Sequence, residues 1–245
     1  MKNIKKLPLI LSILSFLTIF VPANAEIKVV ATIKPIHSLA SYLMDGVGKP
    51  DLIVDGYASP HGFALKPSHA KMIQNADIIF WVGEDIENFL VKPLKTIAKK
   101  AEKIELMEIK GLTKLKFRER NIFDEHGHKD KDDDHGHKED EHGHKDKDDD
   151  HGHDEHAHGE FDPHIWLDPM NAKIILSEMA EHLIEKDQKN ASTYKANLKK
   201  AHNDLDKLTK KVKSELNKDF KSVVFHDAYQ YFEKRFGINL SLIHI

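Results

Sequence analysis

Residues 68–90 read SHAKMIQNADIIFWVGEDIENFL. The first part, Ser68 to Asn75, has helical periodicity and is predicted to be a helix capped by Ser68. The apolar run from Asp77 to Val82 predicts a buried strand. The charged start of another helix is indicated by three acids that follow closely, Glu84, Asp85 and Glu87. A helix, a buried strand and a helix in direct succession are typical of an α/β fold with a parallel sheet.

The same alternation continues on both sides of this stretch. β-branched and apolar runs predict further strands at Ile27–Ile33, Asp51–Val54 and Lys103–Met107. Helical patterns lie between them at His37–Asp45 and Glu87–Lys100. In a parallel sheet, ligand chemistry belongs in the loops at the strand ends, and His61 lies in such a loop.

Two longer helices are predicted in the second half of the chain. Asp168 is a suitable N-cap and Pro169 suits the first helical position, so a helix should run to about Glu185. From Asn190 to Asn217 apolar residues recur at steps of three and four, which predicts a long amphipathic helix. The apolar residues are Tyr194, Leu198, Ala201, Leu205, Leu208, Val212 and Leu216. At 1.5 Å per residue this helix would be roughly 40 Å long. We interpret residues 189–217 as a linker helix between two domains.

The last part of the chain begins a new α/β unit. Ser222–Phe225 is predicted as a strand, His226 follows, and a helix should run from Asp227 to Phe236 and end at Gly237. One strand and one helix cannot make a domain. We therefore divide the chain into an N-terminal α/β lobe at 26–188 and the start of a C-terminal lobe, incomplete, at 218–245.

The N-terminus has the pattern of a secretory signal peptide. Lysines precede an apolar stretch from Leu7 to Val21, and Ala23-Asn24-Ala25 is a small-x-small cleavage site. The apolar stretch is short against the ~20 residues of a transmembrane helix. Glu26 follows the cleavage site where a lipoprotein would have Cys. Residues 1–25 are thus predicted to be removed on secretion to the periplasm.

Residues 124–160 form a low-complexity segment with ten His, sixteen Asp or Glu and five Lys, and the sequence HGHKDKDDDHGH occurs in it twice with a period of 16 residues, from His126 and from His142. Such a segment cannot bury enough apolar surface to fold, so a disordered loop is predicted. Paired imidazoles favour borderline metals over calcium, which prefers oxygen ligands. Weak metal binding is expected at His126, His128, His135, His137, His142, His144, His151, His153, His156 and His158.

The chain has no cysteine, so a tight metal site must use His and carboxylates. Three histidines follow a predicted strand or open a loop: His61, His164 and His226. Three imidazoles with a carboxylate or water would complete a tetrahedral zinc site. Four further histidines lie on predicted helices and are interpreted as surface or helix-packing residues: His37, His69, His182 and His202.

Four motifs occur together in one order: IKPIHSLASYLMDGVG (33–48), DGYASPHGFALKPSHAKMIQNADIIFWVGEDIENFL (55–90), DPHIWLDP (162–169) and VFHDAYQYFEKRFG (224–237). With the His-rich loop, they resemble the zinc-binding receptors of bacterial high-affinity zinc ABC importers. The resemblance implies two α/β lobes joined by a long helix, with zinc in the cleft between them. It also implies ligands at His61 and His164 from the first lobe and His226 from the second.

The same resemblance implies a periplasmic, non-enzymatic receptor that delivers zinc to a membrane permease. We expect a monomer and no nucleic-acid partner. Pro60 stands where some members have a carboxylate before the first ligand, and the second lobe should continue past Ile245. A manganese receptor, a zinc-buffering protein and a zinc hydrolase remain alternatives, although the HExxH motif of many zinc proteases is absent from the sequence.

Overall fold

The computed structural model describes residues 26–118, 159–217, 219, 222–224 and 226–242. The predicted signal peptide lies outside the described residues, and so do all ten histidines of the His-rich segment. Within the described part, no helix combines the length and apolar character that crossing a membrane requires.

A four-stranded parallel sheet forms the centre of the first lobe. Its strands are β1 (Val29–Ala31), β2 (Asp51–Leu52), β3 (Ile78–Trp81) and β4 (Glu102–Glu105). The spatial order is β2-β1-β3-β4, and every neighbouring pair is parallel. The predicted α/β fold with a parallel sheet is therefore confirmed.

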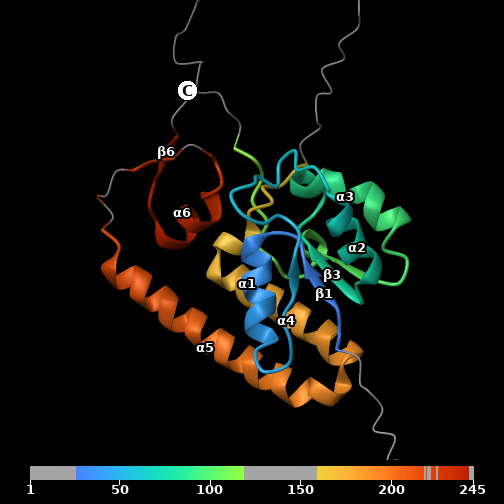
Figure 1. Ribbon diagram of the computed structural model, residues 1–245. Coiled ribbons are helices and arrows are strands. Elements are labelled where there is room, and N and C mark those ends of the chain that lie inside the picture. The colour runs from blue at the N-terminus through green and yellow to red at the C-terminus, as the bar shows by residue number, and fades with distance from the viewer. Residues whose placement is uncertain (1–25, 119–158, 218, 220–221, 225, 243–245) are drawn as a thin grey trace, which may run out of the picture.

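Helices cover both faces of this sheet (Figure 1). One face carries α1 (Lys34–Leu43), α4 (Pro169–Lys186) and α5 (Ala191–Glu215), which contact one another. The other carries α2 (Pro67–Asn75) and α3 (Glu84–Thr96). Short 3-10 helices complete the lobe at Leu106–Glu108, Ile165–Leu167 and Gln188–Asn190. Because helices cover both faces, the central strands β1 and β3 are buried throughout, which explains why β3 reads as an unbroken apolar run.

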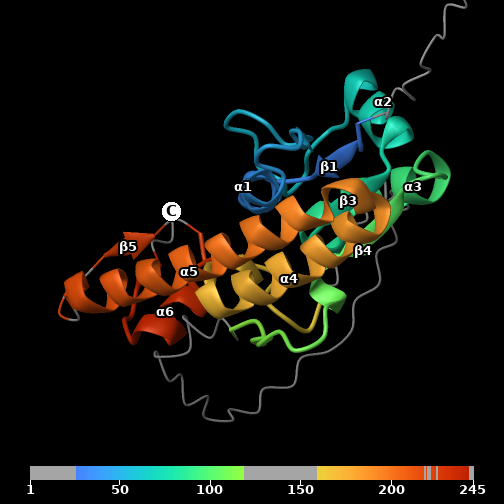
Figure 2. The same ribbon diagram turned by 90° about the horizontal axis from the view of Figure 1, so that it is seen from below.

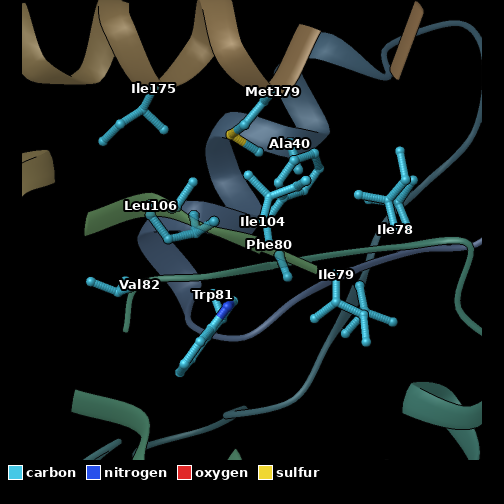
Figure 3. Packing of buried hydrophobic residues seen from close by; sticks show 14 of the residues in the cluster. Ala40, Ile78, Ile79, Phe80, Trp81, Val82, Ile104, Leu106, Ile175 and Met179 are labelled. Atoms are coloured by element: carbon cyan, nitrogen blue, oxygen red, sulfur yellow. The ribbon is translucent and has the colours of Figure 1, made fainter. Parts of the chain in front are cut away.

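The core shows how strand alternation serves the two helical layers (Figure 3). Phe80 points toward Met179 of α4 and Ala40 of α1, whereas Ile79 and Trp81 point to the opposite side of the sheet. All five side chains are buried.

The starts of two helices differ in how they are capped. Helix α2 begins at Pro67 with Lys66 as the N-cap residue, so the predicted cap at Ser68 is wrong. Proline suits the first helical position because it lacks the amide proton that would be unsatisfied there. Asp168 caps α4 as predicted, since its side chain accepts a hydrogen bond from the Met170 amide.

Helix α5 connects the first lobe to the C-terminal unit (Figure 2). Its 25 residues span about 37 Å. The buried Tyr194 hydroxyl donates to Asp187 at 2.9 Å, and Lys173 of α4 pairs with Asp206 at 2.9 Å. The first part of the helix is thus fixed along the lobe, and its far end leads to the C-terminal unit.

The C-terminal unit contains β5 (Val223–Val224), α6 (Gln230–Phe236) and β6 (Ser241–Leu242), with the two strands parallel. Helix α6 starts three residues after the predicted Asp227 and ends at Gly237 as predicted. Gly237 adopts φ +67°, a left-handed conformation that favours glycine at a helix end.

Candidate metal centre

A cavity of about 350 Å³ lies between the first lobe and the C-terminal unit. The first lobe contributes residues that follow the carboxyl ends of its strands, including Ile33 after β1, Val54 after β2 and Ile86 after β3. The C-terminal unit contributes Ala228 and Tyr229, from the turn between β5 and α6. A cavity at this edge of a parallel sheet is the usual place for a ligand site in an α/β fold.

The cavity contains the three histidines singled out from the sequence. His61 lies in the loop after β2, His164 precedes the 3-10 helix at Ile165–Leu167, and His226 follows β5. Although they are far apart in the sequence, one ring nitrogen from each lies within 4.8 Å of the others. The fold therefore assembles a cluster of three imidazoles.

The closest pair in this cluster is His164 and His226. Their rings have centroids 5.0 Å apart, and the two Nε2 atoms are 3.1 Å apart. Two nitrogens bound to one tetrahedral zinc at 2.0–2.1 Å would be separated by about 3.3 Å. His61 completes the cluster, with ring centroids 5.4 Å from His226 and 6.2 Å from His164.

Asp162 orients His164. Its Oδ1 lies 2.7 Å from Nδ1 of the His164 ring and accepts the His164 backbone amide at 3.0 Å. Both residues are buried. With Nδ1–H donated to a carboxylate, the lone pair of Nε2 is directed at the other two histidines. A carboxylate behind a ligating histidine is the common arrangement that fixes the tautomer and raises the basicity of the ring.

His61 and His226 are exposed, in contrast to His164. The His61 loop carries Gly62 at φ +79°, and the His61 amide donates to the Ser59 hydroxyl at 3.2 Å. The cluster is accordingly buried on the His164 side and open to solvent on the side of the other two histidines.

Glu87 lies at the charged helix start that the sequence predicted, in the first turn of α3. The side chain is fully buried, because the residue has φ −117° and ψ 44° and turns its carboxyl group back toward the sheet. Oε2 accepts the amides of Val82 at 2.7 Å and Gly83 at 3.0 Å, and the Thr32 hydroxyl bonds to Oε1. Burial outweighs these bonds and raises the pKa of Glu87 to about 7.

The other histidines make hydrogen bonds away from the cavity, which fits their interpretation as surface and packing residues. The His37 ring contacts the Pro50 carbonyl at 3.0 Å, and the His202 ring contacts the Lys173 carbonyl at 3.0 Å. His69 is buried, and its Nδ1 accepts the Lys66 amide at 3.2 Å.

His182 belongs to a second group of possible metal ligands, with Glu102 and Glu185. The His182 Nδ1 is 2.7 Å from Glu102, and Lys186 pairs with the same carboxylate at 3.3 Å. These contacts form a charged network between β4 and α4. Such a network explains, without a metal, why His182 lies close to the two glutamates.

Sequence reasoning identified the three clustered histidines but gave no role to Asp162. The Asp-Pro-His order was visible, yet a carboxylate two residues before a histidine reaches its ring only in particular backbone conformations. Trp166 is half-buried, lines the cavity and makes an edge contact with the His164 ring.

Comparison with protein families gives a match over residues 29–245 to ZnuA, described as zinc-uptake complex component A, periplasmic. A relative from Brucella abortus (strain 2308), the high-affinity zinc uptake system protein ZnuA, is 49% identical over 223 residues. The match covers 86% of this chain and 65% of that protein. The protein of the same name from Paracoccus denitrificans is 36% identical, with 90% and 68% covered. The chain thus spans about 65% of the length of the Brucella relative.

Solved structures share the fold. A crystal structure of ZnuA superposes with a TM-score of 0.67 at 20% identity and covers 90% of this chain and 71% of that one. The Zn(II)-bound ZnuA-like domain of Streptococcus pneumoniae AdcA gives a TM-score of 0.62 at 18% identity, with 89% and 67% covered. These similarities support the α/β architecture described above.

Proposed function

The chain belongs to the ZnuA family of periplasmic zinc-uptake components, and we propose that it captures zinc through His61, His164 and His226 and delivers it to an ABC importer. The observation that carries this proposal is the cluster of three imidazoles in the cavity between the two units. Relatives named as high-affinity zinc uptake proteins supply the transport context.

The donor set favours zinc over manganese. The three ring nitrogens within 4.8 Å of one another form an all-imidazole group among the described residues. Zinc is well matched by imidazole, whereas manganese prefers more oxygen ligands. Because the cluster is exposed at His61 and His226, a water molecule can supply a fourth ligand.

A zinc hydrolase is the alternative from another functional class. It would need a general base beside the metal-bound water. Glu87 is a buried acid that does not line the cavity, and its carboxyl group is bonded to the Thr32 hydroxyl and two backbone amides. Family membership and this engagement both favour a receptor, and we expect no catalytic activity.

We also propose the remaining features that the sequence implies. Residues 1–25 direct export to the periplasm, and the mature protein is a monomer. The lobe at 26–188, the linker helix at 189–217 and the unit at 218–245 are its structural divisions. The His-rich segment at 124–160 binds additional zinc more weakly and recruits it near the cavity.

Single replacements by alanine test the ligands. Zinc affinity is measured by competition with a chromophoric chelator for His61→Ala, His164→Ala and His226→Ala, with His202→Ala as the matched surface control. We expect each of the first three to lose the tight site and the control to keep it. Tight binding in all three variants would show that the ligands lie elsewhere.

Deletion of 124–160 tests the role of the His-rich segment. We expect a lower zinc stoichiometry with the tight site retained. Transport is tested by zinc uptake in cells that contain or lack the permease. A zinc-buffering protein would act equally in both strains, whereas a receptor requires the permease.

A further inference from the structure

Helix α6 contacts both ends of the segment that carries His164, which is Asp162–Asp168. At the first end, the Tyr231 hydroxyl donates to the Asp162 carbonyl at 2.7 Å, and Gln230 Nε2 donates to Asp162 Oδ2 at 3.2 Å. At the other end, Arg235 donates from Nε and Nη2 to the two carboxylate oxygens of Asp168, at 2.7 and 2.6 Å. We call these contacts the α6 clamp.

The residues at the centre of the clamp are buried, whereas the Arg235 side chain is 30% exposed. Tyr231 is 1% exposed, Asp162 1% and Asp168 4%. A bidentate Arg–carboxylate pair fixes both distance and orientation, because two parallel bonds resist rotation. Tyr231 also accepts the Leu115 amide at 3.0 Å, which ties a third point of the first lobe to the helix.

His226 is linked to the clamp by a short connection. Only three residues separate it from Gln230, where α6 begins, and the Ala228 amide closes a turn onto the His226 carbonyl at 2.9 Å. The adjacent Asp227 pairs with Arg118 of the first lobe at 3.2 Å. The position of α6 therefore determines where the His226 ring lies relative to His164.

We propose that Tyr231, Gln230 and Arg235 are positioning residues of the zinc centre, which hold His226 beside His164 through contacts that do not involve the metal. The inference rests on the proposed function and deepens it. The Nε2 atoms of His164 and His226 are held 3.1 Å apart, close to the separation that tetrahedral zinc requires. Zinc binding therefore costs less conformational entropy, because two ligands are already in place.

Two variants each remove one contact of the clamp with little change in shape. Tyr231→Phe keeps the ring and loses the hydroxyl, and Arg235→Gln loses the charge and the bidentate contact. Asp168→Asn keeps an oxygen to cap α4 while weakening the pair with Arg235. Lys173→Gln is the matched control, because it breaks another ion pair of α4, with Asp206, that does not contact α6.

We expect zinc to bind roughly 10- to 100-fold more weakly to Arg235→Gln and Tyr231→Phe in the full chain, as for other residues that orient metal ligands. Lys173→Gln should bind as the unaltered protein does. Adding Asp168→Asn to Arg235→Gln should cost little more, because both changes remove one contact. Arg235→Lys should restore affinity only in part, because lysine lacks the planar fork.

The visible absorption of bound Co²⁺ separates positioning from a general loss of stability. At saturating Co²⁺, we expect the clamp variants to show an altered ligand-field spectrum that approaches that of His226→Ala, whereas Lys173→Gln should keep the original bands. Unchanged affinity and spectrum in Tyr231→Phe and Arg235→Gln, with a clear loss in His226→Ala, would overturn the clamp alone. Unchanged zinc affinity in His226→Ala would instead overturn the ligand assignment.

Discussion

Replacement of Asp162 by asparagine tests how much the buried carboxylate contributes to zinc affinity. The amide has nearly the same shape as the carboxylate and can still accept a hydrogen bond from Nδ1 of His164, so the change mainly removes the negative charge. In the native protein that bond is 2.7 Å long and buried, and the same oxygen accepts the His164 amide at 3.0 Å. Hydrogen bonds to an ionised acceptor are roughly twice as strong as neutral ones.

The expected loss follows from the change in basicity at Nε2. Removal of a carboxylate behind a metal-ligating histidine costs roughly 10- to 100-fold in metal affinity. This corresponds to about 1.4 to 2.7 kcal/mol of binding free energy. The zinc affinity of Asp162→Asn should therefore be roughly 10- to 100-fold lower than that of the native protein, while the geometry of the cluster is largely retained.

The assay is competition between the protein and a chromophoric chelator at fixed pH. Asp206→Asn serves as the control, because it neutralises a carboxylate on α5 that pairs with Lys173 of α4, and neither residue lines the cavity. An affinity for Asp162→Asn equal to that of the control would refute the reasoning. It would mean that the charge of Asp162 does not reach the metal through His164.

Three further expectations concern stability. Because burial raises the pKa of Glu87 from 4.5 to about 7, the folded state holds its proton more tightly than the unfolded state, and up to about 3 kcal/mol of stability should be lost as the pH rises from about 4.5 through 7. Glu87→Gln should remove this loss, as urea melts at several pH values would reveal. Tyr194→Phe removes the buried hydroxyl that donates to Asp187 and should cost about 1 kcal/mol in the same assay. Met179→Ala opens a cavity in the core and should cost about 2 to 5 kcal/mol, visible as a lower thermal midpoint.

The sequence predicted the order of strands and helices because each buried element carries its own periodicity. The predicted strand Ile27–Ile33 is observed only at Val29–Ala31, since burial extends beyond the residues that pair with neighbouring strands. Periodicity reports burial and does not report hydrogen-bonded pairing. The long helix was predicted within two residues of its observed ends, Ala191 and Glu215, because its apolar residues recur at helical steps of three and four.

Glu87 illustrates what periodicity cannot reveal. Three acids in one helical turn usually face solvent, and Glu84 does so here. The burial of Glu87 depends on amides that Val82 and Gly83 present after β3, together with a hydroxyl from Thr32 after β1. Such a partner set comes from two segments that are distant in sequence, so it is defined only when the sheet is assembled.

Asp162 lies beside the histidine cluster but does not offer it a free carboxylate oxygen. One carboxylate oxygen accepts from the ring and the amide of His164, and the other accepts from Gln230. Both oxygens are therefore engaged in orienting protein groups, and the cluster presents imidazole nitrogens to the cavity. Since soft and borderline metals gain more from imidazole than hard ones do, this use of Asp162 favours zinc over manganese at the same position. On the proposed ligand assignment, the same buried carboxylate would serve both the orientation of His164 and the choice of metal.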